Sequence, residues 1–300
     1  MIKNFDELLD LAVKKGPKRI SVACAQDDDV LKAIKTAYDK GIVNGYLIGN
    51  EAEIRAIATE ISLDLSGFEI INILDLAEAS LKAVELVSSG KADLVMKGLV
   101  DTGIILKAVL NKEVGLRTGN VLSHVAVFDV PTYHKILMVT DAAMNIAPDL
   151  NAKKQIIENT LFVTRALNIE MPNVGVIAAK EKVTESMIAT VDAGELVKMN
   201  QEGLITGCKV GGPFALDNAV SKEAAEIKGI KDPMAGDVDV LLCPTIEAGN
   251  VLYKALNFLA NAKSAGIIVG AKAPIVLTSR ADSDDSKLNS IALGVLMASI

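Results

Sequence analysis

RISVACAQDDDVLKAIKTAYDKGIVNGYLIGN (19–50) is the stretch that decides the fold. An aliphatic run at 19–25 is followed by apolar residues at three- and four-residue spacing over 29–40, and then by a second aliphatic run at 45–50. Short aliphatic runs are typical of buried strands. Apolar residues at three- and four-residue spacing, as over 29–40, are typical of an amphipathic helix. The stretch therefore predicts a strand, a right-handed crossover helix and a parallel strand.

The same alternation continues along the chain. Further strands are predicted at 68–74, 92–98, 124–130, 135–141, 173–179, 238–244, 266–271 and 274–279, and further helices over 76–89, 151–167, 184–199, 221–228 and 248–261. Hydrophobic residues make up 50% of the chain while aromatic residues make up 3%, so the core is expected to consist of Ala, Val, Ile and Leu. This composition suits helices packed on mainly parallel sheets, and the fold class predicted is α/β with doubly wound domains.

A length of 300 residues is typical of a chain with two domains. The runs 124–130 and 135–141 are separated by Pro131-Thr132-Tyr133-His134, which is too short for a helical crossover. This link is either a hairpin or a passage between domains. We therefore expect one domain from 1–130 plus 272–300 and a second, inserted domain from 131–271. The glycine-rich stretch 203–221 is interpreted as a loop region or a small extra sheet.

Charge and cysteine content exclude several classes of function. The formal net charge of −7 argues against nucleic acid or an anionic membrane as a bulk partner. Three widely spaced cysteines and two histidines support neither a disulfide framework nor a zinc site, so no metal is expected. Acidic residues interrupt the apolar residues near the start of the chain, and no apolar run reaches the roughly 18 residues that span a bilayer. We expect a protein of a reducing compartment, the cytoplasm.

The loops after strands are where ligands bind in such folds. The sequence has neither G-x-G-x-x-G nor G-x-x-x-x-G-K-[ST], so the usual fingerprints of dinucleotides and nucleoside triphosphates are missing. In MKGLVDTG (96–103), Lys97 follows a strand and precedes a helix that could face an anion. From spacing alone, a β-turn with an Asp or Thr N-cap is the simpler interpretation of this segment.

Two more strand ends carry polar residues. In VTDAAMNIAPD (139–149), capping of the next helix explains Asp149 but leaves Thr140, Asp141 and Asn145 without a structural role. In LLCPTIEAGNVLYKAL (241–256), a glycine lies inside the first turns of a helix, near Glu247 and Asn250. Since glycine there costs about 0.8–1.0 kcal/mol relative to alanine, it indicates close approach of a ligand or, equally, tight packing.

The most specific strand end is PIVLTSRADSDDSKLNSIALG (274–294). Ser283 is predicted to cap a helix, and Asp284 and Asp285 have the sign that the helix dipole favours. Arg280 has no such structural explanation. A guanidinium beside a helix N-terminus is suited to binding phosphate.

Five ordered segments resemble the phosphate acetyltransferase/phosphate butyryltransferase family: KGLVDTG (97–103), SHVAVFDVP with KILMVTDAAMNIAPD (123–149), GPFALDNAVS (212–221), CPTIEAGNVLYKAL (243–256) and VLTSRADS (276–283). The length and the S-R-A-D-S form are more similar to the butyryl branch than to the acetyl branch. The resemblance implies two α/β domains of the isocitrate/isopropylmalate dehydrogenase type, an active site in an interdomain cleft, and at least a homodimer. It implies reversible transfer of a butyryl group between coenzyme A and inorganic phosphate, both of which are substrates, with no cofactor and no metal.

The resemblance also implies roles for individual residues. The catalytic Ser-Arg pair of the acetyl branch falls on Ser279 and Arg280. Its downstream Asp falls on Ser286 here, so we select the neighbouring Asp285 as the base, ahead of Asp282 and Asp141. A phosphate-binding Arg of that branch is replaced, and Lys107 is the nearest basic residue. The substrate-binding residues predicted in total are Lys97, Lys107, Thr140, Asp141, Asn145, Glu247 and Asn250.

Three other functions remain open from the sequence. The same chemistry with acetyl as the preferred group is the nearest. An NAD(P)-dependent hydroxy-acid dehydrogenase shares the two-domain architecture, but its glycine-rich fingerprint is missing. A non-catalytic protein that binds small anions has no use for a Ser-Arg pair with nearby acidic residues.

Overall fold

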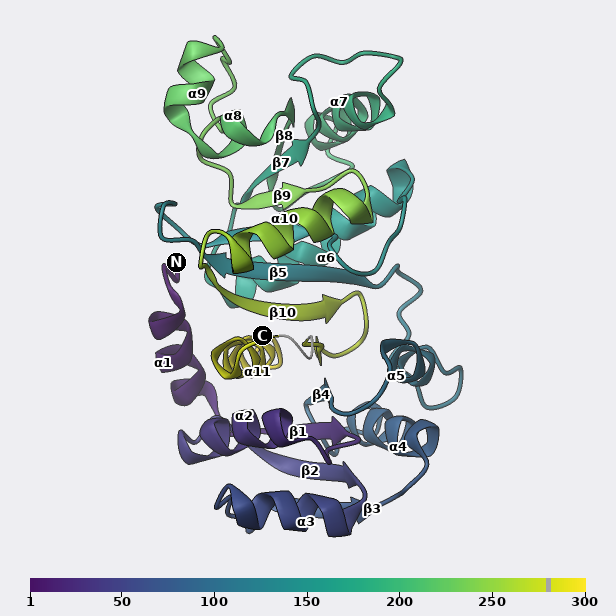
Figure 1. The fold of residues 1–300 in the computed structure, drawn as a ribbon. Coiled ribbons are helices and arrows are strands. Elements are labelled where there is room, and N and C mark those ends of the chain that lie inside the picture. Colours follow the sequence, from purple (N-terminus) through teal and green to yellow (C-terminus); the bar gives the residue numbers. More distant parts are fainter. Residues whose placement is uncertain (279–281) are drawn as a thin grey trace. The chain divides into compact units, whose positions relative to one another are not determined.

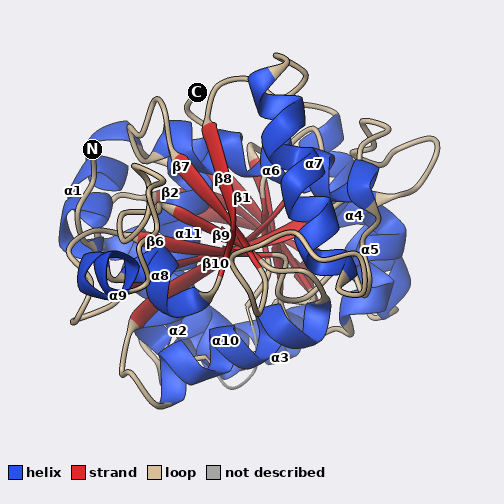
Figure 2. Cartoon of the chain, turned by 90° about the horizontal axis from the view of Figure 1, so that it is seen from above, coloured by secondary structure: helices blue, strands red, loops and turns tan. Residues whose placement is uncertain are grey.

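The fold is taken from a computed structural model that describes residues 1–278 and 282–300. The chain divides into two compact units. The first, called here the N-terminal unit, contains Phe5–Asn120 and Ala265–Ile300, and the central unit contains Met1–Asn4 and Val121–Ser264. Figure 2 shows the strands of both units in red and their helices in blue.

The N-terminal unit has the strand order β3-β2-β1-β4-β11-β10. Its strands are β1 (Lys18–Ala23), β2 (Val43–Gly49), β3 (Phe68–Asn72), β4 (Leu94–Lys97), β10 (Lys263–Val269, which starts at the division between the units) and β11 (Ile275–Val276). Its helices are α1 (Phe5–Lys15), α2 (Asp28–Asp39), α3 (Glu51–Glu60), α4 (Leu76–Ser88), α5 (Thr102–Val109) and α11 (Asp284–Met297). The pairs among β1 to β4 and between β4 and β11 are parallel, whereas β10 and β11 pair antiparallel (Figure 1).

The central unit has the strand order β5-β6-β9-β7-β8. Its strands are β5 (Ser123–Asp129), β6 (Leu137–Thr140), β7 (Asn173–Ile177), β8 (Lys209–Phe214) and β9 (Val240–Leu242). Its helices are α6 (Leu150–Ala166), α7 (Ile188–Gln201), α8 (Leu216–Val220), α9 (Lys222–Ile227) and α10 (Ile246–Phe258). Only the β5–β6 pair is antiparallel among the described pairings within this unit. The predicted α/β class with mainly parallel sheets is confirmed.

The link 131–134 joins a hairpin. β5 pairs antiparallel with β6, with Val125 opposite Thr140 at one end and Phe128 opposite Leu137 at the other. Both strands belong to the central unit. The division therefore falls at 120/121 and again at 264/265, whereas the sequence-based bounds were 130/131 and 271/272. Those bounds separate β5 from its hairpin partner, because the short link is open to two interpretations, a hairpin or a passage between domains, and the bounds follow the second.

Local chemistry explains why the elements begin where they do. The side chains of Asp27, Asn50, Asp75, Asp149 and Ser283 accept hydrogen bonds from backbone N–H groups in the first turns of α2, α3, α4, α6 and α11. These bonds satisfy donors that have no partner inside a helix. The capping roles predicted for Asp149 and Ser283 are confirmed.

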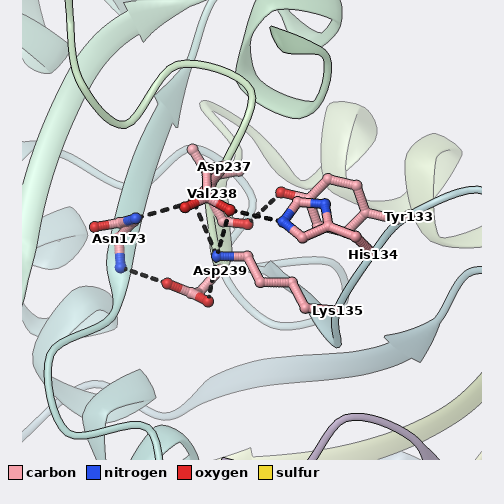
Figure 3. Close-up of polar contacts among 7 residues, drawn as sticks. All are labelled: Tyr133, His134, Lys135, Asn173, Asp237, Val238 and Asp239. Atoms are coloured by element: carbon pink, nitrogen blue, oxygen red, sulfur yellow. Dashed lines mark hydrogen bonds and ion pairs between the residues drawn. The ribbon is translucent and has the colours of Figure 1, made fainter.

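A polar network holds the amino ends of three central-unit strands (Figure 3). Lys135, with a side chain 11% exposed, forms ion pairs of 3.1 Å with Asp237 and 2.8 Å with Asp239. The second carboxylate oxygen of Asp239 accepts from the backbone N–H of Asn173, the first residue of β7, at 2.7 Å. His134 Nε2 lies 2.7 Å from Asp237 Oδ1. Since ligands bind at carboxyl ends in such sheets, this network at the amino ends is structural.

Candidate active site

A pocket of about 140 Å³ lies at the carboxyl ends of strands in the N-terminal unit. Because β1, β4 and β11 are parallel neighbours, the residues that follow them gather at one edge of the sheet. The pocket is lined by Asp27, Asp29, Val30, Lys97, Gly98, Thr278 and Lys287. The fold thus brings together residues from three distant parts of the sequence, 27–30, 97–98 and 278–287.

Two buried lysines line this pocket. Lys97, the last residue of β4, is 8% exposed, and its Nζ donates to the carbonyl oxygen of Gly98 at 3.3 Å. Lys287 on α11 is 3% exposed, and its Nζ donates to the carbonyl oxygen of Asp282 at 2.5 Å. Two ammonium groups on one pocket lining are suited to a small anion.

Backbone packing fixes the position of Lys97. A Cβ on Gly98 would lie 2.3 Å from the carbonyl oxygen of Cys24, so only glycine allows this chain segment to approach the end of β1. The Gly98 N–H donates to the carbonyl oxygen of Ala23 at 2.8 Å. The Lys-Gly order is therefore a packing requirement that also delivers the lysine into the pocket.

Three predicted catalytic residues are close in sequence to residues that line this pocket. Ser279 and Arg280 lie outside the described residues, and they directly follow Thr278, which lines the pocket. Asp285 is exposed in the first turn of α11, two residues before Lys287. Lys107 is exposed in the last turn of α5 and is not among the residues that line the pocket.

The other predicted binding residues belong to the central unit. Thr140 is fully buried, and its hydroxyl donates to the carbonyl oxygen of His124 at 2.9 Å. Asp141 Oδ1 accepts from the N–H groups of Ala143 and Met144, and Asp141 Oδ2 accepts from Asn145 Nδ2 at 2.6 Å. These bonds give Thr140 and Asp141 structural roles that the sequence did not reveal, because their partners come from β5 and from the turn itself.

Helix α10 packs directly on this turn. Asn250 Nδ2 donates to the carbonyl oxygen of Ala142 at 3.2 Å, and a Cβ on Gly249 would lie 2.2 Å from the carbonyl oxygen of Asp141. The glycine thus serves tight helix packing, one of the two interpretations that the sequence left open. Glu247 is exposed near the start of α10, where its own backbone N–H and the Thr245 hydroxyl hold the pKa of its carboxyl below the ordinary value.

The structure groups the predicted residues into two sets. Asp141, Asn145 and Asn250 meet around one turn of the central unit, while Lys97 lines the pocket of the N-terminal unit. Sequence reasoning missed Lys287, Asp27 and Asp29. One signal was present for Lys287: it stands at the head of the largely apolar run that follows the Ser283 cap.

Fold and pocket together define an α/β protein with two units and an anion-suited pocket at the carboxyl ends of parallel strands. The chain belongs to the phosphate acetyl/butaryl transferase family, whose model matches residues 4–78 and 74–295. It is 51% identical over 298 residues to the phosphate butyryltransferase of Clostridium beijerinckii, with 99% of both chains covered. It is 45% identical over 294 residues to the phosphate acetyltransferase of Thermotoga maritima, covering 98% of this chain and 99% of that one.

A solved structure agrees with these relatives. The crystal structure of a branched-chain phosphotransacylase from Enterococcus faecalis matches with a TM-score of 0.83 and 32% identity, covering 94% of this chain and 99% of that chain. The family resemblance found in the five sequence segments is confirmed.

Two absences concern the described residues alone. Within 1–278 and 282–300, no helix combines the length and apolar character needed to cross a membrane. In the same ranges, no three His, Cys, Asp or Glu side chains are grouped as ligands for a metal ion.

Proposed function

We propose that the protein transfers a short acyl group, butyryl by preference, between coenzyme A and inorganic phosphate. The observation that carries this proposal is the full-length similarity to a phosphate butyryltransferase at 51% identity. The buried lysines of the pocket support it, because the reaction needs a site for a small, highly charged anion.

The reaction proceeds by direct transfer in a ternary complex. A phosphate oxygen attacks the thioester carbonyl carbon, the C–O bond forms, the C–S bond breaks, and coenzyme A leaves as the thiol after taking up a proton. In reverse, the thiol gives its proton to a base and its sulfur attacks the carbonyl carbon of the acyl phosphate, so that the C–S bond forms, the C–O bond breaks and phosphate leaves. A free thiol with a pKa of roughly 8.5 is only a few per cent thiolate at neutral pH, so a positioned carboxylate contributes about 10²–10⁴-fold in rate.

The chain supplies groups for each requirement. We assign Arg280 to the phosphate and the developing negative charge, Ser279 to donation towards the carbonyl oxygen, and Asp285 to the base. Lys97 adds positive charge at the strand end, and Lys107, Asn145, Glu247 and Asn250 are proposed to contact the substrates. Positioning both substrates together supplies the remaining acceleration. No cofactor takes part in this scheme, in which coenzyme A and phosphate are the substrates.

A chain-length profile tests the function. The release of coenzyme A from acetyl-, propionyl-, butyryl- and hexanoyl-coenzyme A is followed with a thiol reagent, with and without phosphate. We expect phosphate-dependent release that is fastest with butyryl-coenzyme A. Highest kcat/KM with acetyl-coenzyme A would instead support the acetyl chemistry of the relative at 45% identity. The absence of phosphate-dependent release with all four would contradict acyl transfer, and an acyl-enzyme burst would contradict direct transfer.

Location and assembly are part of the proposal. Cys24, Cys208 and Cys243 are buried free thiols, which suits the reducing cytoplasm. Assembly as a homodimer or larger homo-oligomer is supported by Val251, Phe258 and Leu259 on and beside α10, which are 68%, 67% and 86% exposed. Sedimentation at several protein concentrations measures the mass, and a strictly monomeric protein would contradict this assembly.

A further inference from the structure

Lys287 is buried without a close carboxylate partner. Its side chain is 4% exposed, and its Nζ lies 3.7 Å from Asp29 Oδ2, whose own side chain is 52% exposed. Direct N–H···O hydrogen bonds span about 2.7–3.2 Å, so this carboxylate is too far away to accept one. Within the described ranges, its only hydrogen bond goes to the Asp282 carbonyl. An ammonium has three donors, which leaves capacity for a ligand.

Two other lysines of low exposure, Lys153 and Lys135, are paired closely with carboxylates. Lys153 Nζ lies 2.5 Å from Asp192 Oδ2, with side chains 5% and 15% exposed. Lys135 forms ion pairs of 2.8 and 3.1 Å with Asp239 and Asp237. Lys287 is as buried as Lys153 but lacks this arrangement. The contrast indicates that its intended anion is a ligand and not a side chain of the pocket.

The place of Lys287 on α11 is unfavourable for a cation. It lies in the first turns of the helix, four residues after the Ser283 cap, where the helix dipole favours negative charge. Burial disfavours the charged form of a lysine as well. A bound anion would offset both costs, and Lys97 lines the same pocket.

The size of the pocket selects the anion. A volume of about 140 Å³ exceeds the roughly 10–15 Å³ that one water needs, yet it is below the about 300–1,000 Å³ of pockets that enclose larger organic ligands. A tetrahedral phosphate fits this range, whereas a whole coenzyme A does not. Asp27 and Asp29 also line the pocket, and Asp27 is already engaged by the Val30 N–H at 2.9 Å.

We infer that Lys287, together with Lys97, binds the inorganic phosphate co-substrate in this pocket, and that Asp29 competes with phosphate for Lys287. This inference rests on the proposed function. It assigns a phosphate-binding role to a lysine on α11, in addition to the role proposed for Arg280.

Steady-state kinetics of Lys287→Met test the assignment. We expect the KM for phosphate to rise roughly tenfold to a hundredfold, as expected for a lost charged hydrogen bond, while the KM for butyryl-coenzyme A changes less than about twofold. Lys287→Arg retains the charge and should recover most of the phosphate affinity. The matched control is Lys32→Met, which removes an exposed lysine from neighbouring α2 and should leave both KM values unchanged.

Asp29→Asn provides a second test that does not depend on altering a buried residue. Because Asp29 is an exposed competitor for Lys287, its neutralisation should lower the KM for phosphate by about twofold to fivefold. As a readout without turnover, phosphate should raise the Tm of the unaltered protein and raise that of Lys287→Met much less.

Each outcome separates the two proposals. An unaltered protein without phosphate-dependent turnover would overturn the proposed function. Normal turnover with an unchanged KM for phosphate in Lys287→Met would overturn the inference alone. A higher KM for phosphate in Asp29→Asn would do the same. An increase confined to the KM of butyryl-coenzyme A would show that the pocket holds a phosphate group of coenzyme A, which also overturns it.

Discussion

At the scale of single residues, buried polar groups differ in how fully neighbouring groups of the chain satisfy them. Asp141 is almost completely buried, and the Ala143 and Met144 N–H groups and Asn145 satisfy its carboxylate. Lys287 is equally buried but has its nearest carboxylate at 3.7 Å. The sequence singled out Asp141 and passed over Lys287, because hydrogen-bond partners and burial depend on tertiary contacts that a strand-end pattern does not contain.

Arg280→Ala tests the residue on which the proposed chemistry depends most. Removing the guanidinium should lower turnover by well over about tenfold, because the phosphate loses a charged, bidentate donor. The Tm should stay within about 1–2 °C of the unaltered value if the residue serves chemistry and not folding. Arg55→Ala, at an exposed pair with Glu51 on α3, is the control and should retain full activity. Near-normal turnover of Arg280→Ala would remove this residue from the site.

A pair of helical glycines gives a prediction about packing. Gly249→Ala places a Cβ 2.2 Å from the Asp141 carbonyl oxygen and should destabilise the protein by about 1–3 kcal/mol. Gly103→Ala, on α5, meets nothing within 4 Å and should stabilise it by up to about 0.5–1 kcal/mol. Urea denaturation of both variants measures the difference. Equal stabilities would mean that α10 moves away from the turn without cost.

At the scale of secondary-structure elements, periodicity predicted the strands and helices well where side chains carry the pattern. β8 (Lys209–Phe214) is the informative exception, since its glycines made 203–221 resemble a loop or a small extra sheet. Gly211 leaves room for Met234, because a Cβ there would lie 2.1 Å from its Cε. Pro213 is tolerated because β8 is the last strand in the order of its unit. Glycine and proline here report contacts between elements, which local patterns do not record.

The network at the amino ends of the central-unit strands predicts a dependence on pH. Burial alone would raise the pKa of the Asp237 carboxyl, but hydrogen bonds from His134 and Lys135 outweigh it and hold the pKa below its ordinary value of 3.8. A lowered folded-state pKa gives stability that is complete above the unfolded-state value and is lost as the pH falls through the folded-state value. Acid should therefore weaken this end of the unit.

Denaturation of Asp237→Asn measures this contribution. The unaltered protein should be more stable than the variant at about pH 5, and the difference should shrink as the pH falls to about 2.5. Asp39→Asn serves as the control. Asp39 pairs with Lys35 on α2, which is remote in sequence from the network. A difference between unaltered protein and Asp237→Asn that stays constant over this range would exclude the titration of Asp237 as its cause.

At the scale of the whole molecule, the two units differ in how the chain builds them. The central unit is continuous from Val121 to Ser264 apart from Met1–Asn4, whereas the N-terminal unit needs both Phe5–Asn120 and Ala265–Ile300. The core cluster around Phe128, Phe214 and Leu241 is formed entirely within the continuous stretch. The sequence predicted such an insertion, but its bounds depended on how the β5–β6 hairpin was interpreted.

Separate expression of the pieces tests this organisation. Fragment 121–264 should fold by itself and unfold cooperatively in urea, because it contains all five strands of its unit. Fragment 5–120 lacks β11 and α11 and should stay largely unfolded, and adding the peptide 265–300 should increase its helical circular dichroism. Cooperative unfolding of 5–120 alone would contradict the need for the C-terminal elements.

The discontinuous N-terminal unit has a consequence for biosynthesis. A ribosome that makes this chain releases Phe5–Asn120 first, yet β11, which pairs with β4, and α11, which packs on α1 and α2, are synthesised only after the central unit. Domains generally fold as units while the chain emerges, so the central unit completes its sheet first. Until β11 is synthesised, the edge of β4 that pairs with it stays exposed. The nascent N-terminal half is therefore the part of this protein that most needs chaperone protection.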